Sequence, residues 1–448
     1  MVQTFAMPWG GVSQKTSAFT ASVLGDAFGP RSVSVGPGSS VIPRGIVDIE
    51  WANVLRAGFG CLDPRSGRSR VWSDPVIAAG RCGFLSLSVR TAFDALLTAM
   101  DWAPGSEILM SAITIADMLR IIKEHGLVAV PLDVPCNTLA PTAEQVARQI
   151  TPRTRAVMVT HLFGSKARLE AIGAVCRQNS LPLWEDVAQS YNADVPVADP
   201  AADVSFFSFG KIKTRTAAGG ALVLFRDPDL ALATQEVEST FPQQSRAAYA
   251  RALTDLAILK LLGSGFAFSA TGVACRLVGT DLEKLLNLSS QGFAGENLFA
   301  RMRCRPSDAL TKFLRQRLTS KGGTKLGWKQ KLADEYRRTL RMDCLVGAAA
   351  NFPTRWVYPI RCHAPLQLVE TLRAAGYDAT SRASRLVVAP SPAQHPGAKP
   401  IEAAAWLPNT VYLPLHPLLN HHLQQEIANA VNRHCDQGLA ANAGVPPE

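Results

Sequence analysis

The chain has 448 residues, of which 47% are hydrophobic and 18% charged, and its formal net charge is +10 at pH 7. This length allows two or three domains, and the composition is ordinary for a soluble globular protein with a large core. Residues 301–341 hold the whole positive surplus, with thirteen lysines and arginines against three acids. We interpret this stretch as a solvated helical face, with steering of acidic substrates as the alternative. No interleaved aromatic pattern or fold signature supports nucleic-acid binding, so none is expected.

The nine cysteines are odd in number, scattered along the chain and without a C-x-x-C pair. They predict buried or free thiols in a reducing, cytoplasmic compartment, and neither a disulfide framework nor a metal site. The N-terminus lacks the basic region and apolar run of a secretory signal. The most apolar stretch, Leu261 to Cys275, is shorter than the roughly 20 residues that span a bilayer. We predict a buried or interfacial helix there, and contact with a lipid surface stays open.

Residues 1–80 are predicted to form an N-terminal extension and a first helix. The first 42 or so residues are rich in Gly, Ser, Pro and Val without a sustained period, which favours an irregular extension. A helix is expected from Asp48 to Gly58, because Trp51, Val54 and Leu55 fit one helical face. Residues 61–80 are expected to form a loop.

Strands and helices alternate from about Cys82 onward. A helix is predicted over 88–100, and the chain then alternates between strands and helices over 107–111, 115–125, 127–133, 144–150, 155–160 and 168–178. This βαβ rhythm favours a parallel sheet.

Residues 181–225 contain three further predicted strands, over 181–184, 203–209 and 221–225. The first ends in Glu185 and Asp186, and the second runs into a loop with Lys211 and Lys213. Polar residues beyond the carboxyl ends of strands line the ligand crevice of open α/β sheets. We therefore expect Asp186 and Lys213 to face each other across one pocket.

A carboxylate and a lysine so placed suit pyridoxal 5'-phosphate. The lysine holds the aldehyde as a Schiff base, and the carboxylate keeps the pyridine nitrogen protonated so that the ring accepts electrons. Either residue alone is more often a turn or a solvated side chain. The joint pattern predicts a cofactor site.

Two motifs in this region resemble those of the DegT/DnrJ/StrS family of sugar aminotransferases. E-D-V-A-Q at 185–189 is similar to the family's E-D-x-A-Q, and S-F-G-K-I-K at 208–213 is similar to its S-F-x-x-x-K. The spacing of the second motif selects Lys213, and not Lys211, as the Schiff-base lysine.

The resemblance implies a role for each matched residue. Asp186 would pair with the pyridinium, Ala188 would pack on the ring, Gln189 would bond the ring hydroxyl and Ser208 would bind the phosphate. Lys213 and Asp186 are the implied catalytic residues.

The predicted helix over 88–100 supplies further phosphate ligands by resemblance. Helix N-termini bind phosphate because their first amides lack partners and carry the positive end of the helix dipole. The family has G-T-x-A-L here, so Thr91 and Ala92 carry over, whereas Arg90 replaces the glycine. Arg90 either adds a phosphate contact or points to solvent.

Two other positions depart from the family. Ile115 stands where the family places an aromatic residue over the cofactor ring, and it would cover the ring without aromatic stacking. Arg303 replaces an asparagine that reaches the partner subunit's cofactor phosphate, so a phosphate contact in trans is expected. His161 lies in H-L-F-G, which is similar to the family's H-L-Y-G, and we interpret it as a hydrogen-bonded spacer.

The C-terminal half begins with a region that has no recognised counterpart. Residues 229–300 are predicted to be a helical insertion or cover, for which packing in the core or at an interface is the default. A linking helix is expected from Pro306. Residues 301–435 complete a small domain with a strand over 355–361, helices over 365–375 and 422–432, and the segment 411–419, which resembles the family's L-P-L-H-P. Residues 436–448 are expected to be a disordered tail.

The fold implied by the resemblance is that of fold type I transferases dependent on pyridoxal phosphate. It consists of a large α/β domain, here residues 81–228, around a mostly parallel seven-stranded sheet, and a small C-terminal α/β domain. The family works as a homodimer with composite sites.

The implied activity is transfer of an amino group from an amino acid, L-glutamate, to a ketone. By resemblance the ketone is a nucleotide-linked keto-sugar in glycan or secondary-metabolite biosynthesis. Two alternatives stay open: dehydration or epimerisation with the same cofactor, and a non-catalytic regulatory or surface-binding protein of this fold. Lys213 argues against the first, because the family's dehydratases carry histidine at that position.

Overall fold

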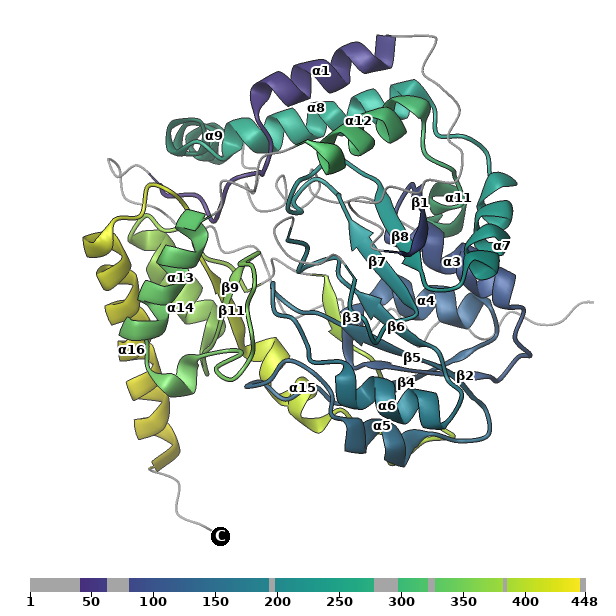
Figure 1. The fold of residues 1–448 in the computed structure, drawn as a ribbon. Coiled ribbons are helices and arrows are strands. Elements are labelled where there is room, and N and C mark those ends of the chain that lie inside the picture. Colours follow the sequence, from purple (N-terminus) through teal and green to yellow (C-terminus); the bar gives the residue numbers. More distant parts are fainter. Residues whose placement is uncertain are drawn as a thin grey trace, which may run out of the picture. The chain divides into compact units, whose positions relative to one another are not determined.

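A seven-stranded sheet organises the part of the chain that the computed structural model describes, residues 41–62, 80–192, 198–277, 297–320, 327–381 and 385–443 (Figure 1). In the order β1-β8-β7-β6-β5-β2-β4 its strands are Cys82–Ser86, Ala221–Phe225, Val204–Ser208, Leu183–Asp186, Thr154–Thr160, Glu107–Ser111 and Val128–Leu132. β8 runs antiparallel to β1 and β7, and the other neighbours are parallel. The predicted mostly parallel seven-stranded sheet is confirmed.

Helices cover both faces of this sheet. On one face α3 (Val89–Met100), α4 (Ala116–Glu124) and α7 (Pro228–Ser239) pack on the strands, with Phe93 edge-on to Trp184 and Phe206. On the other face lie α5 (Ala143–Gln149), α6 (Glu170–Gln178), α8 (Arg246–Leu262) and α12 (Asp308–Thr319). Both faces of a parallel sheet must be buried, which accounts for the continuous apolar strands.

The predicted helix over 88–100 is α3, and its ends follow from the local sequence. Ser88 is the extended N-cap whose hydroxyl accepts the N–H of Thr91 at 3.1 Å, and Asp101 ends the helix with φ 43°. The cap fixes the start of the helix directly after β1.

The region predicted as a helical insertion or cover contains α7, α8 and α9 (Gly265–Leu277) in its described part. Tyr249, Leu253 and Leu256 of α8 are buried in the core with α12 and strands β7 and β8, so α8 is a core helix. The apolar stretch 261–275 is not one helix, because the chain breaks at Gly263. Among the described helices none alone is long and apolar enough to cross a bilayer, although α8 and the start of α9 qualify together with a 98° bend.

The C-terminal part has its own hydrophobic cluster, made of residues between Ala333 and Cys435 together with Ile42. It contains the antiparallel pair β9 (Tyr358–Arg361) and β11 (Thr410–Leu413) with helices α13 (Gly327–Thr339), α14 (Pro365–Ala374) and α16 (His421–Ala443), which Figure 1 shows gathered around the pair. The tail expected to be disordered from residue 436 is helical as far as Ala443.

Cys344 and Cys435 form a disulfide within this cluster, and the other seven cysteines are free. The expectation of thiols throughout is therefore wrong for this one pair. The two cysteines lie 91 residues apart in sequence, and such a pairing leaves no local spacing pattern to recognise.

Several elements escaped prediction because they are short. β3 (Ile113–Ile115) pairs with β10 (Leu386–Val388), and neither was predicted as a strand. By contrast, the expected first helix is present as α1 (Trp51–Leu62), which packs along α8. Helices α11 (Leu298–Met302) and α15 (Ile401–Trp406) complete the described chain, together with the 3₁₀ turns Met342–Cys344 and Leu407–Asn409. Residues 1–40 of the expected extension and most of the expected loop 61–80 lie outside the described residues, and the domain boundaries stay predictions.

Candidate active site

The site predicted from the sequence lies where β6 and β7 end. Asp186 is the last residue of β6, and Ser208 is the last residue of β7. β6 and β7 are parallel neighbours, so both side chains leave the sheet at its carboxyl edge. The loop from Phe209 to Gly220 follows β7 and carries Lys213, and we name it the lysine loop.

The lysine loop is held by hydrogen bonds from three other elements. Asp48, ahead of α1, accepts the N–H of Arg215 at 2.6 Å, and Arg317 of α12 donates to the carbonyl of Thr216 at 3.2 Å. Tyr249 of α8 donates its hydroxyl to the carbonyl of Ala217 at 3.0 Å. A connection that would otherwise be free to move is thus fixed next to Asp186.

The two lysines of this loop have different surroundings. Lys211 is buried, and its ammonium forms an ion pair of 2.6 Å with Asp255 of α8. Lys213 turns to the other side, where its Nζ lies 3.8 Å from the centre of the Trp356 ring. Lys213 is therefore the lysine whose amine lies at the strand ends with Asp186.

Burial and neighbouring charges shift the pKa of both groups. Burial lowers the pKa of Lys213 to about 8, against the attraction of Asp186 and with added repulsion from Arg90. Burial likewise raises the pKa of Asp186, against the Ala188 N–H bond to its Oδ1 at 2.9 Å and the charge of Lys213. The mutual interaction shows that the carboxylate and the amine share one environment.

Arg90 points into this environment and not to solvent. Its side chain is 19% exposed and forms an ion pair of 2.7 Å with Asp117 of α4. Burial lowers the pKa of Arg90, and the charges of Arg385 and Asp186 act on it as well. The alternative that Arg90 points to solvent is therefore wrong, whereas a phosphate contact stays a prediction.

His161 is a buried, hydrogen-bonded residue, as interpreted. Its Nδ1 accepts the N–H of Ala167 at 3.0 Å, and its Nε2 lies 2.8 Å from Glu185. Glu185 also accepts the hydroxyl of Ser205 at 2.6 Å and the N–H of Asp199 at 2.7 Å. Burial alone would raise the pKa of Glu185, but these hydrogen bonds hold it below its usual value. This network fixes the end of β6 from the side opposite to Asp186.

The other residues of the first motif lie beside Asp186. Ala188 is half-buried, and the amide oxygen of Gln189 accepts the N–H of Phe163 at 2.9 Å. That bond fixes the orientation of the Gln189 amide. Their contacts with a cofactor stay predictions.

Thr91 and Ala92 lie fully buried in the first turn of α3. The Thr91 hydroxyl donates to the carbonyl of Met302 at 2.8 Å, and the N–H of Ala92 bonds the carbonyl of Ser88 at 3.1 Å. Because these donors are engaged within the chain, the predicted phosphate contacts gain no direct support. They too stay predictions.

Ile115 and Arg303 both have partners within the chain. Ile115 ends β3 and faces Leu386 of β10. Arg303 forms two hydrogen bonds, of 2.9 and 3.0 Å, with the fully buried Asp94. Burial alone would raise the pKa of Asp94, but bonds from His125 and Arg303 hold it low. The contact of Arg303 with a partner subunit's phosphate stays a prediction.

Trp356 belongs to the site and was not found from the sequence. Its Nε1 donates to the carbonyl of Ile212 at 2.9 Å, and its ring covers the amine of Lys213. The sequence shows only a tryptophan at the start of a predicted strand, 143 residues after Lys213. No local pattern connects residues so far apart.

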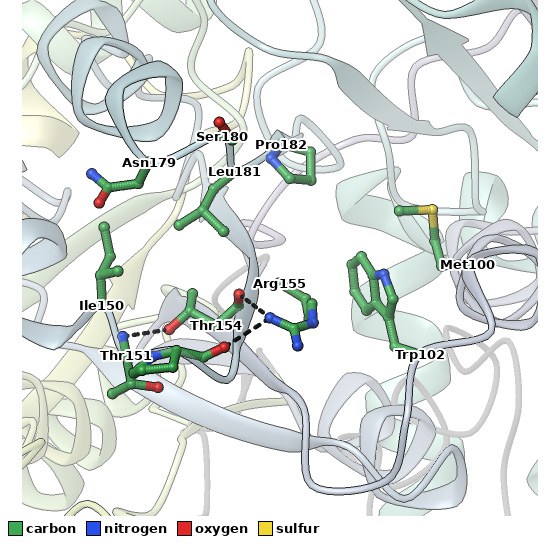
Figure 2. A pocket seen from close by; sticks show the side chains of 11 residues that line it. Met100, Trp102, Ile150, Thr151, Thr154, Arg155, Asn179, Ser180, Leu181 and Pro182 are labelled. Carbon is green, nitrogen blue, oxygen red and sulfur yellow. Dashed lines mark hydrogen bonds between the residues drawn. The ribbon is translucent and has the colours of Figure 1, made fainter.

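A separate pocket of about 630 Å³ lies at the opposite edge of the sheet (Figure 2). It is lined by Trp102, by Arg155 near the start of β5 and by Pro182 just before β6. Arg155 donates to the carbonyls of Pro152 and Thr154. Ligands of open α/β sheets bind at the carboxyl ends of the strands, so this pocket is not the candidate active site.

Comparisons with known proteins bear on the fold and on part of the chain. Residues 87–291 match the model of the DegT/DnrJ/EryC1/StrS aminotransferase family. A 3-amino-5-hydroxybenzoate synthase of Amycolatopsis mediterranei (strain S699) is 30% identical over 156 residues, which are 34% of this chain and 39% of that protein. A dTDP-4-dehydro-2,3,6-trideoxy-D-glucose 4-aminotransferase of Saccharopolyspora spinosa is 33% identical over 134 residues, 30% of this chain and 35% of that protein. The chain thus covers little more than a third of the length of either relative.

The fold is shared more widely. The aminotransferase TlmJ from Streptoalloteichus hindustanus superposes with a TM-score of 0.53 at 20% identity, over 89% of this chain and 93% of that chain. At this identity the likeness establishes the fold alone. The likeness in sequence to the DegT/DnrJ/EryC1/StrS aminotransferase family is thus confined to residues 87–291, a little less than half of the chain.

Proposed function

We propose that the protein is a pyridoxal-phosphate-dependent aminotransferase. It moves an amino group from an amino acid, L-glutamate, to a ketone, and the ketone is a nucleotide-linked keto-sugar. The observation that carries the proposal is the environment shared by Asp186 and Lys213 at the carboxyl ends of β6 and β7.

The residues present fit the cofactor. A partly buried amine with a pKa of about 8 is free of its proton often enough near neutral pH to bond an aldehyde. A carboxylate beside it suits the protonated nitrogen of a pyridine ring. By family resemblance Ser208, Thr91 and Ala92 would hold the phosphate, and Ile115, Ala188 and Gln189 would hold the ring. Arg303 would reach the phosphate bound to the partner subunit.

The bound cofactor would supply the aldehyde that takes up the amino group and a ring that accepts electrons. Lys213 would take a proton at Nζ from the α-carbon of the amino donor and deliver it to the carbon of the cofactor's aldehyde group. A base works best when its pKa is close to the working pH, and the pKa of about 8 meets this condition. Asp186 would keep the ring nitrogen protonated.

The keto-sugar acceptor is inferred from the family and from its members. The relative from Saccharopolyspora spinosa is named for a dTDP-linked keto-sugar, whereas the relative from Amycolatopsis mediterranei is named for an aminobenzoate. A panel of acceptors should therefore include both nucleotide-linked keto-sugars and carboxylated ring ketones.

Trapping of the cofactor tests the proposal. The protein is loaded with pyridoxal phosphate, reduced with borohydride and mapped by mass spectrometry, and the adduct is expected on Lys213. Lys213→Ala should lose the adduct and lower turnover by about 10² to 10⁴ or more. Lys211→Ala, in the same loop, is the control and should keep the adduct. An adduct that persists in Lys213→Ala would refute the assignment.

We also propose that the protein works as a homodimer. Trp51, Leu55, Phe59 and Leu62 of α1 are 43 to 76% exposed and lie on one side of the helix. A contiguous apolar stripe of this kind is typical of an interaction surface. Light scattering should give twice the mass of the chain, and Leu55→Glu with Phe59→Glu should shift the protein to the monomer.

A further inference from the structure

One segment of the C-terminal part reaches across to the lysine loop. The backbone of Asn351 accepts the N–H of Lys166 at 2.8 Å, and the backbone of Pro353 accepts the Asn192 side chain at 2.9 Å. These bonds attach residues 351–353 to the loops that follow β5 and β6. The chain then continues directly to Trp356.

Gly164 makes the close approach possible. Its φ is +100°, and a Cβ at this position would lie 2.5 Å from the carbonyl oxygen of Thr354 and 3.0 Å from the nitrogen of Trp356. Only glycine leaves room for the backbone here. The position of Trp356 is therefore set by its backbone as well as by its side chain.

The indole of Trp356 is fixed over the amine of Lys213. Its Nε1–H is held by the carbonyl of Ile212, the residue before the lysine, and the ring centre lies 3.8 Å from Nζ. A ring at this distance excludes water from one side of the amine. It also attracts the ammonium through its electron-rich face.

We propose that Trp356 is a positioning residue for Lys213: its indole shields the amine from water and gives it a fixed position whenever the amine is free. The catalytic consequence of this inference rests on the proposed function, because Lys213 would have to leave a bound cofactor and return to it in each cycle. An amine held by the ring returns to the same place each time. No contact between Trp356 and a substrate is required.

Two effects of the ring oppose each other. Shielding from water favours the neutral amine, whereas attraction by the ring favours the ammonium. The charged groups that act on Lys213 are Asp186 of β6, which raises its pKa, and Arg90 of α3, which lowers it, and burial is the largest influence. Removal of the indole should therefore admit water and raise the pKa of Lys213.

The test measures the titration of Lys213 without cofactor. The apoprotein is labelled with trace acetic anhydride at several pH values, and the extent of labelling at each lysine is read by peptide fragmentation. In Trp356→Ala the pKa of Lys213 should rise by about one unit, so that labelling at pH 8 slows several-fold. Trp356→Phe keeps a ring over the amine and should change labelling by no more than about twofold.

Lys211 is the control within the same loop. It is paired with Asp255 and has no contact with Trp356 among the described contacts, so its labelling should be unchanged in both variants. Trp328→Ala, a half-buried tryptophan of α13, controls for loss of an indole elsewhere. An unchanged Lys213 titration in Trp356→Ala overturns the proposal, and so does an equal shift at Lys211, which would mean that the whole loop has loosened.

The outcome is independent of the cofactor test. If Lys213 forms no borohydride-stable adduct but its titration shifts in Trp356→Ala, the aminotransferase proposal fails and this inference stands without its catalytic consequence. If the adduct forms on Lys213 but its titration is unchanged in Trp356→Ala, the aminotransferase proposal stands and the proposed role of Trp356 is overturned.

Discussion

At the scale of single residues, the site depends on charged side chains whose arrangement in space could be predicted from the sequence only in part. Asp186 and Lys213 stand in motifs, and each follows a strand, so their meeting was predictable. Arg90 was recognised as a departure, but the direction of its side chain depends on Asp117, which follows two strands later in the chain. Trp356 was missed because it comes from a different part of the fold. Local sequence specifies strand ends better than it specifies which distant segment covers them.

Replacement of Arg90 should raise the pKa of Lys213. The guanidinium repels the ammonium, so Arg90→Gln removes a charge that holds the pKa down, and the pKa of Lys213 should move upward from about 8. The labelling experiment described for Trp356 measures this shift. Arg120→Gln is the matched control, because Arg120 lies 3.8 Å from the same Asp117, and no shift of Lys213 is expected there. A lower pKa in Arg90→Gln would contradict the assignment of its charge to the site.

Replacement of Glu185 should destabilise the fold in a pH-dependent way. The Glu185 carboxylate accepts hydrogen bonds, whereas in Glu185→Gln an amide N–H₂ group would face the imidazole ring or the hydroxyl that donates to it. Because that hydrogen bond is lost in a buried site, the free energy of unfolding at pH 7 should fall by about 3 kcal/mol. Because the pKa of Glu185 is depressed in the folded state, its contribution is complete above the unfolded pKa of about 4.3. It is lost as the pH falls through the lower, folded pKa.

Urea unfolding from pH 3 to 7 measures this effect. The difference between the native protein and Glu185→Gln should narrow at the acid end. The exposed Glu236 serves as control, since Glu236→Gln should leave stability within about 0.5 kcal/mol at every pH. A gap that is constant with pH would mean that the Glu185 carboxylate is not the stabilising group.

At the scale of elements, the sequence predicts long and periodic segments well. The bounds of β2 and β8 agree with the prediction residue for residue, and α3 begins one residue after its cap. The strand expected over 355–361 begins only at Tyr358, because residues before it turn to lie on the lysine loop. β3 and β10 have three residues each, too few to show a period. Tertiary contacts decide these shorter elements.

The hydrogen bond between α8 and the lysine loop should be measurable. Tyr249→Phe removes the bond to the carbonyl of Ala217 in a buried site and should cost about 1 to 2 kcal/mol of unfolding free energy. Amide exchange in residues 209–220 should become faster. Tyr336→Phe, which removes a similar bond to the carbonyl of Pro414, should cost as much without any change in that loop. Equal exchange in both variants would show that α8 does not restrain the loop.

Basic residues of the 301–341 stretch likewise have individual roles. Arg317 and Lys329 are buried, and Arg303 pairs with Asp94, so the stretch is not a uniformly solvated face. The interpretation as a solvated face holds only for exposed members such as Arg301 and Arg338. A count of charges in a sequence cannot separate these two kinds, because burial depends on the packing of the helices.

At the scale of the whole described molecule, Gly164 controls how the C-terminal part meets the sheet. Gly164→Ala forces a Cβ against the carbonyl of Thr354 and should destabilise the protein by about 2 kcal/mol or more, with faster amide exchange over residues 351–357. Gly105→Ala is the matched control, because Gly105 also has a positive φ, +82°, but nothing lies within 4 Å of its Cβ position. It should show only the backbone strain of about 1 kcal/mol. Similar exchange profiles in the two variants would argue against contact at Thr354.

The order of strands in the sheet has a consequence for how the protein folds during its synthesis on the ribosome. Among the described strands of the sheet, β1 is the first to be synthesised, and its sole neighbour among them, β8, is the last. Until the final strand emerges, β1 has no partner in the sheet, and closing so long a loop is slow. A nascent chain arrested before residue 221 should therefore expose an unpaired apolar strand, and it should be a client for chaperones that the full-length chain no longer needs.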